Sequence, residues 1–391
     1  MAVPLRGRPG RIALTIAMSH EMNKNSADEA EPFVQHHPAI LRVPPQTRAV
    51  PAGYFLEFGG AITRAEWMNS FRWRSRGVGV QKKTAAAVEA PLAPPVNEEY
   101  FEWIDLLEAV DQARDRGQFV MVDLGAGYGR WSVHGALAAR AAGIEAHCVT
   151  VEAEPSHARW MRQHFVDNGL SPADHELLWA AMSPEGGFVP FGIGRARMSY
   201  SGEVGKRSEA PYPTAAERRR LRARSALGRP PHVDSELRGS MWVPALTLTD
   251  ILAPYPIIDL IDLDVQGAEH AVLSAAIRRL NARVRRVHVG THGGSAGVED
   301  GVRELFTKHR WTCVYDYAAG ALVDTPYGRI QFYDGVQSWV NPDVGRPEVA
   351  PTAPLHGEEI ARLNERVWRL KQRLRVLKSD ASKSADEDAS D

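Results

Sequence analysis

The chain has 391 residues, 44% of them apolar, and a formal net charge of -1. This length and apolar content allow a full hydrophobic core, in one large domain or in two. The near-neutral charge excludes the global basic field by which many proteins attract nucleic acid.

Two cysteines, Cys148 and Cys313, lie inside apolar, strand-like runs, and we expect both to be buried free thiols. They give neither a disulfide framework nor the spacing of a zinc site. No apolar run reaches the roughly 18 residues of a membrane span. The arginine-flanked apolar segment near residue 12 lacks a clean cleavage site for a signal peptide. We therefore expect a cytoplasmic protein without a membrane span or a nucleic-acid partner.

Residues 1–50 are rich in Pro, His and mixed charge and show no sustained period, which predicts a disordered extension. Residues 51–96 are predicted to form an accessory cap, with a strand and a short helix near its start, followed by a proline-rich linker. The cap would cover one end of the core.

From residue 97 to residue 340 the sequence alternates between helical and strand patterns. The expected helices span residues 97–117, 130–143, 155–169, 268–280 and 297–309. The expected strands span residues 118–124, 145–153, 175–183, 255–265 and 283–292. This alternation predicts an α/β fold with a doubly wound, mostly parallel seven-stranded sheet of the Rossmann-like type. Two further strand-like runs, 310–317 and 328–336, are close enough to predict a C-terminal antiparallel hairpin.

Two segments fall outside this alternation. A basic insertion at 195–240 carries an arginine cluster that could grip an anionic acceptor or could be a solvated loop. In the region 341–391, a linker precedes apolar residues at steps of three and four, which predict a separate heptad helix over 356–378. This helix could mediate self-association, bind a partner helix or lie on its own domain, and the acidic tail after it should be disordered.

The most informative motif is VDLGAGYGRW, which begins at Val122. Gly125, Gly127 and Gly129 follow a buried strand, where the chain must turn sharply and pass close to a ligand. A dinucleotide site has the spacing G-x-G-x-x-G, whereas here Asp123 precedes glycines at alternate positions. Since a carboxylate would repel a pyrophosphate, this acid favours a ligand with a cationic amino-acid portion, such as S-adenosylmethionine.

Two acidic motifs follow. In VEAEP, Glu154 lies where the second strand should end and could accept both ribose hydroxyls, with Glu152 on the same side as the second candidate. In IDLIDLDVQGAEHAVL, alternation places Asp262 and Asp264 on one face and Asp259, which we interpret as structural, on the other. Asp264 falls at the carboxyl end of its strand, where open parallel sheets bind ligands, while Glu269 suits a helix cap.

With these three motifs, the chain resembles the FkbM family of class I S-adenosylmethionine-dependent methyltransferases over about residues 98–335. The resemblance implies O-methylation of a hydroxyl group on a small-molecule or glycan acceptor, such as a sugar or secondary metabolite. It also implies which residues bind the cofactor. Asp123, Gly125, Gly127 and Gly129 would hold the methionine part, Glu154 the ribose, and Ala181 and Met182 the adenine. Asp262 and Gln266 depart from the lysine and glutamate common in the family.

A hydroxyl acceptor needs a base, and Asp264 is the first catalytic candidate and His292 the second. His288 is expected in the core. Asp262 and Asp264 could bind magnesium, but the sequence shows no third ligand, so no metal is predicted. Two other functions stay open: a nicotinamide-dependent oxidoreductase, and a non-catalytic scaffold that acts through the heptad helix.

Overall fold

The computed structural model describes residues 35–68, 79–194, 196, 211–233, 239–292 and 297–344. The predicted heptad helix at 356–378, the acidic tail and most of the predicted N-terminal extension lie outside these residues.

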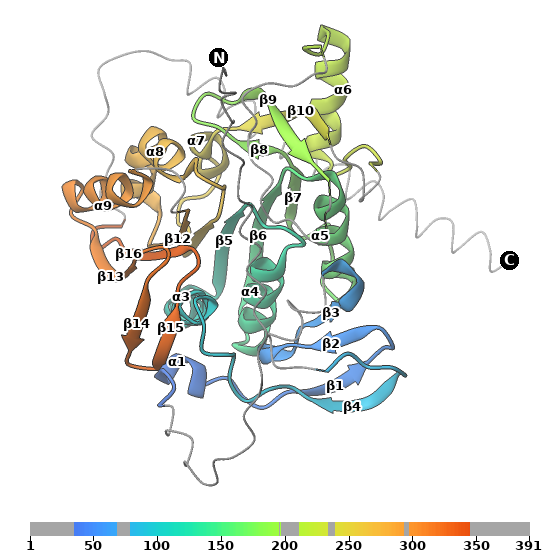
Figure 1. Cartoon of the computed structure of the whole chain (residues 1–391), viewed down its shortest axis with the longest axis vertical. Coiled ribbons are helices and arrows are strands. Elements are labelled where there is room, and N and C mark those ends of the chain that lie inside the picture. Colours follow the sequence, from blue (N-terminus) through green and yellow to red (C-terminus); the bar gives the residue numbers. More distant parts are fainter. Residues whose placement is uncertain are drawn as a thin grey trace, which may run out of the picture. The chain divides into compact units, whose positions relative to one another are not determined.

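A seven-stranded sheet forms the centre of the fold (Figure 1). Its strands are β5 (Gln118–Leu124), β6 (Glu145–Glu152), β7 (Glu176–Trp179), β11 (Leu260–Leu263), β12 (Arg286–Thr291), β13 (Thr312–Tyr317) and β16 (Gly335–Val340). Their order is β13-β16-β12-β11-β5-β6-β7, and β16 alone runs antiparallel to its neighbours. The predicted mostly parallel, doubly wound sheet is therefore confirmed. The strand order reverses between β5 and β11, which is where such sheets bind ligands.

Helices cover both faces of this sheet. Alternation along β5 sends Phe119 and Met121 into one apolar core, together with α3 (Glu99–Ala113), α4 (Arg130–Ala141) and α5 (Pro155–Asp167). Val120 and Val122 point into the opposite core, which also contains residues of α7 (Leu248–Leu252), α8 (Glu269–Arg283) and α9 (Val298–Lys308). A short 3-10 turn, η3 (Arg114–Arg116), leads from α3 into β5. Because helices cover both faces of the sheet, the parallel strands are continuous apolar runs in the sequence.

The segment before α3 is more ordered than the sequence predicts. The elements are α1 (Pro38–Leu41), β1 (Thr47–Val50), β2 (Tyr54–Leu56), η1 (Phe58–Gly60), β3 (Ile62–Arg64), η2 (Ala65–Trp67) and β4 (Ala85–Glu89). The expected disorder is wrong for residues 35–50, because Ile40 and Val50 are buried and β1 pairs with β4. That pairing also turns part of the predicted linker into a strand.

The expected third strand and the basic insertion contribute to a second, smaller sheet. The strand breaks after Trp179, and β8 (Ala181–Met182) pairs with β10 (Gly239–Leu246), which also pairs with β9 (Gly187–Ile193). Within the insertion, α6 (Ala215–Ala226) begins with a capping box between Thr214 and Glu217. Part of the insertion is thus a regular helix rather than a loop.

The C-terminal antiparallel edge exists, but its pairing differs from the prediction. β13 pairs with β16, whereas β14 (Leu322–Thr325) and β15 (Gly328–Gln331) form a small hairpin of their own. The edge position of β13 leaves Cys313 exposed, which corrects the expectation of a buried thiol, while Cys148 is buried. Among the described residues, no helix has the length and apolarity needed to cross a membrane.

Candidate active site at the carboxyl ends of the strands

The glycine bend connects β5 to α4 with a left-handed backbone at all three glycines, with φ of 83°, 56° and 74° at Gly125, Gly127 and Gly129. A Cβ on Gly125 would lie 1.7 Å from the Asp264 carbonyl oxygen, and one on Gly129 would lie 2.9 Å from Met161 Cγ. The first contact brings the bend against the end of β11. Side chains are therefore excluded both by backbone conformation and by space.

The second strand places Glu152, rather than Glu154, against this bend. The Glu152 carboxylate accepts hydrogen bonds from the Gly127 N–H at 2.7 Å and from the Glu154 N–H at 2.6 Å. Glu154 is the N-cap of α5, where its Oε2 accepts from the His157 N–H at 2.7 Å and its buried Oε1 has no hydrogen-bond partner. The geometry thus favours the second candidate of the sequence analysis as the acid nearest the bend.

Asp123 is buried under the bend, where its Oδ2 accepts from the Ser132 N–H at 3.1 Å and from the Ser132 hydroxyl at 2.7 Å. Burial raises the pKa of Asp123 to about 7, with a further contribution from the charge of Glu152. Burial likewise raises the pKa of Glu152 to about 6. Burial is the largest cause of both shifts, so both carboxyl groups hold their protons more tightly than exposed acids do, and a cationic ligand beside them would favour their charged forms.

Three neighbouring strands place acidic and imidazole side chains in one row. Asp262 lies in register with Asp123 on one side and with His288 on the other, and all three follow the alternation that points toward α3. Glu102 of α3 completes an inner cluster of Glu102, Asp262 and His288, whose ligand-type atoms lie within 4.8 Å of one another. The pKa values of Glu102 and Asp262 are raised well above their usual range. Burial is the largest cause, and neighbouring negative charge is the second.

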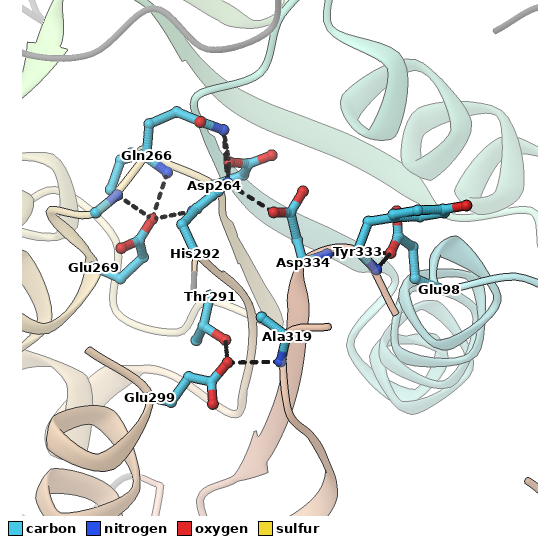
Figure 2. Close-up of polar contacts among 12 residues, drawn as sticks. Glu98, Asp264, Gln266, Glu269, Thr291, His292, Glu299, Ala319, Tyr333 and Asp334 are labelled. Atoms are coloured by element: carbon cyan, nitrogen blue, oxygen red, sulfur yellow. Dashed lines mark hydrogen bonds and ion pairs between the residues drawn. The ribbon is translucent and has the colours of Figure 1, made fainter. Parts of the chain in front are cut away.

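An outer cluster of Asp264, Glu269 and His292 lies just beyond the strand ends (Figure 2). Glu269 is fully buried, and its Oε1 accepts from the Val265 N–H at 3.2 Å and the Gly267 N–H at 3.0 Å. The same oxygen lies 3.0 Å from His292 Nδ1. Glu269 therefore shapes the turn before α8, as a capping residue would, and also orients the imidazole.

The other side of the imidazole faces Asp264, whose side chain is about half exposed. His292 Nε2 lies 3.2 Å from Asp264 Oδ1 and 2.7 Å from Gln266 Nε2, which also donates to Asp264 Oδ1 at 2.8 Å. Burial of His292 opposes its charge, but the contacts with Asp264 and Glu269 outweigh this and raise its pKa to about 10. The imidazole is thus mostly protonated at neutral pH, so Asp264 is the group positioned to accept a proton.

Two further carboxylates hold the loops around the outer cluster in place (Figure 2). Glu98 accepts from the Tyr333 N–H at 2.7 Å and brings Asp334 to 4.0 Å from His292 Nε2. Glu299 accepts from the Ala319 N–H at 2.8 Å and from the Thr291 hydroxyl at 3.3 Å.

The remaining candidates lie in a strand or directly before one. Ala181 and Met182 are buried in β8, directly after the point where the Ala180 N–H donates to the Glu152 carbonyl. Asp259 binds Arg116 and the Val120 N–H at the opposite end of the sheet, as a structural residue should. Asp262 and Asp264 belong to separate clusters, in which Asp262 lies with Glu102 of α3 and His288 of β12, and Asp264 lies with Glu269 and His292.

The sequence analysis did not find Glu102, Asp334 or the link from Glu269 to His292. The sequence did contain one indication of Glu102. It lies next to Phe101, on a helix that was expected to pack on the sheet. No signal marked Asp334, because its position depends on the loop that Glu98 holds.

Part of the chain is similar to known methyltransferases. Residues 123–310 match the model of the methyltransferase FkbM domain. A protein of Jannaschia sp. (strain CCS1) named "Putative methyltransferase" is 24% identical over 247 residues, which are 63% of this chain and 80% of that protein.

Solved structures of methyltransferases are similar to a lesser degree. Precorrin-6y C5,15-methyltransferase from Geobacter metallireducens GS-15 has a TM-score of 0.32 and 11% identity, over 60% of this chain and 86% of that one. A SAM-dependent methyltransferase from Agrobacterium tumefaciens also has a TM-score of 0.32, with 14% identity over 76% and 90% of the two chains.

Proposed function

We propose, on the premise that residues 123–310 form a methyltransferase FkbM domain that uses S-adenosylmethionine, that the chain methylates a hydroxyl oxygen of a sugar, glycan or secondary metabolite. The observation that supports methylation of a hydroxyl oxygen is the outer cluster. It presents a half-exposed carboxylate, Asp264, at the strand ends, next to the glycine bend.

The residues around the bend fit this cofactor. Gly125 and Gly127 offer backbone without side chains, and the bend borders the carboxylates of Asp123 and Glu152. A cationic sulfonium and an ammonium group are attracted to such a site. We infer that Glu152 binds the ribose hydroxyls and that Glu154 supports it as the α5 cap, with Ala181 and Met182 near the adenine.

The chemistry needs a nucleophilic oxygen and a place for its proton. S-adenosylmethionine supplies a methyl group that is electrophilic because it is bonded to a sulfonium. Asp264 would accept a hydrogen bond from the acceptor hydroxyl and take its proton as that oxygen gains the methyl group. His292, held as a cation by Glu269, would fix the orientation of Asp264. Much of the acceleration would come from positioning.

The same charges argue against the nicotinamide alternative. Two buried carboxyl groups, Asp123 and Glu152, border the bend, where a dinucleotide would place its pyrophosphate. The scaffold alternative depends on residues 356–378, which lie outside the described residues, and it gives no reason for a side-chain-free bend lined by acids.

Calorimetric titration of the purified full chain tests the cofactor site. We expect binding of S-adenosylmethionine and of its demethylated product and none of NAD. Glu152→Gln should weaken S-adenosylmethionine binding about 10-fold or more, as the loss of charge-assisted hydrogen bonds predicts. Glu154→Gln is the matched control and should change affinity much less, since an amide can still cap α5. Preference for NAD, or a larger effect of Glu154→Gln, would overturn the assignment.

The acceptor is tested separately. The chain is incubated with S-adenosylmethionine labelled in the methyl group and a host extract, and the labelled species are identified. A labelled ether supports the proposal, whereas label on nitrogen, carbon or a carboxyl group would contradict O-methylation of a hydroxyl.

A further inference from the structure

The inner cluster of Glu102, Asp262 and His288 has no role in the proposed function, although it concentrates costly groups. Asp262 is 6% exposed, and its buried Oδ1 has no hydrogen-bond partner. Among the described residues, the side chains of buried Asp262 and partly buried Glu102 have no hydrogen bond or ion pair. Burying a carboxylate without a partner is unfavourable. Two neighbouring carboxyl groups without partners therefore suggest that a bound cation balances their charge.

The histidine of the cluster is prepared as a ligand. His288 Nδ1 lies 2.7 Å from Asp105 Oδ2, and Asp105 also receives the Ser338 hydroxyl at 2.7 Å and an ion pair from Arg286. A carboxylate so placed accepts a hydrogen bond from the Nδ1–H and so favours the tautomer in which Nε2 has the free lone pair. A carboxylate behind a histidine is the usual second-shell support of a metal-binding imidazole.

The space between these side chains suits an ion. A narrow gap with no room for a water molecule is lined by Glu102, Asp262 and His288, with apolar walls that include Met121 and Trp131. The three ligand-type atoms lie within 4.8 Å of one another. A bound transition-metal ion lies roughly 2.0–2.2 Å from such nitrogen and oxygen atoms, so small side-chain rotations would close the site.

We propose that Glu102, Asp262 and His288 bind one divalent transition-metal ion, with Asp105 as the residue that orients His288. One imidazole and two carboxylates form a donor set for zinc or manganese rather than an oxygen-only set for magnesium or calcium. The ion would supply the counter-charge for Asp262 and Glu102, and it would join α3 to β11 and β12. This proposal does not depend on the identity of the methyl acceptor or on the methyl transfer itself.

Metal content and affinity test the proposal in the full chain. The purified protein is dialysed against a chelator, and Mn²⁺, Zn²⁺ and Mg²⁺ are then titrated separately, with bound metal measured by mass spectrometry. We expect one equivalent of Mn²⁺ or Zn²⁺ per chain and at least ten-fold weaker binding of Mg²⁺. Co²⁺ in place of these ions should give a visible absorption band that depends on His288.

Three variants locate the site. Asp262→Asn and His288→Gln should each weaken Mn²⁺ or Zn²⁺ binding at least ten-fold. Glu269→Gln, in the outer cluster, is the control and should leave the affinity within about two-fold. The metal should raise the melting temperature of the wild type but not that of Asp262→Asn, which without metal should be at least as stable as the wild type because it lacks a buried negative charge.

Each opposite result overturns the proposal. No metal binding by the wild type would show that the carboxyl groups are kept neutral by protons alone. Binding that Glu269→Gln abolishes and Asp262→Asn leaves intact would move the ion to the outer cluster. If Asp262→Asn does not fold, His288→Gln and the Co²⁺ spectrum still decide. Failure of methyl transfer would leave all these measurements unchanged, so the two proposals fail separately.

Discussion

The inner and outer clusters each combine two carboxyl groups and one histidine, yet their surroundings give them different chemistry. In the outer cluster both nitrogens of His292 face carboxylates, Glu269 on one side and Asp264 on the other, and its charge is already balanced. In the inner cluster, His288 is fixed from one side by Asp105, which lies outside the cluster, and among the described residues no hydrogen bond or ion pair reaches the side chains of its two acids. If both proposals hold, the neighbours of each triad, rather than its composition, decide whether it transfers protons or binds an ion.

The Asp264→Asn variant tests most directly whether the outer cluster transfers protons. If Asp264 accepts the proton of the acceptor, its loss should lower kcat by about 10²- to 10⁴-fold, the usual contribution of a general base. S-adenosylmethionine affinity should change little, because the ligand contacts assigned to Asp123 and Glu152 remain. The measurement is turnover of labelled S-adenosylmethionine with the identified acceptor, next to calorimetric binding.

Gln266→Asn serves as the control for this variant. Gln266 has φ of 57°, a conformation that asparagine tolerates, and its amide contacts the same oxygen of Asp264. A loss of less than about ten-fold is expected for it, as for a contact that only orients the base. Equal losses in both variants would show that Asp264 acts by position and not as a base.

A second prediction concerns Gly125, which joins the glycine bend to the outer cluster. Gly125→Ala would bring a Cβ to 1.7 Å from the Asp264 carbonyl oxygen, so either the bend or the end of β11 must move. Strain of this kind costs about 1–3 kcal/mol, and we expect S-adenosylmethionine affinity to fall by up to roughly 100-fold. Calorimetric titration of the folded variant measures this.

Gly143→Ala separates strain from collision. Gly143 has φ of 74°, close to that of Gly125, but a Cβ there would have no atom within 4 Å. It should destabilise the fold modestly and leave affinity unchanged. A similar loss of affinity in both variants would mean that backbone strain alone, and not contact with β11, explains the glycine.

Prediction from the sequence succeeded where a pattern is local and failed where packing decides. The period of β5 and β6 and the D-x-G-x-G-x-G spacing gave the sheet, the bend and the cofactor, since each follows from residues close together in the chain. The sequence analysis ranked Glu154 ahead of Glu152, although both fit the strand end, because the Gly127 contact that separates them cannot be read from the sequence. The same holds for Glu102, whose relation to Asp262 depends on how α3 packs.

The pairing of the last strands failed for a similar reason. The sequence favours neighbours along the chain, whereas β16 inserts between β12 and β13. Residues 35–50 were misread because prolines and histidines dilute the few apolar residues that are buried. In both cases the deciding contacts join residues far apart in the sequence.

The smallest expected effect is on stability and comes from the charge of His292 in the outer cluster. Its pKa in the folded protein is about 10, above the value near 6.5 of an unfolded chain. Protonation therefore favours the folded state: the stabilisation is complete below pH 6.5 and is lost as the pH rises toward 10. Relative to His292→Gln, the wild type should have its largest advantage in melting temperature near pH 6 and progressively less above it.

Ring ¹⁵N chemical shifts provide the direct measurement, because they separate an imidazolium from a neutral imidazole. His292 should stay protonated at pH 8 in the wild type, and Glu269→Gln should lower its pKa by removing the carboxylate at Nδ1. A neutral His292 at pH 8 would reverse the assignment of roles. The imidazole, with Gln266 donating to Nε2, would then be the free base, and Asp264 the group that orients the acceptor.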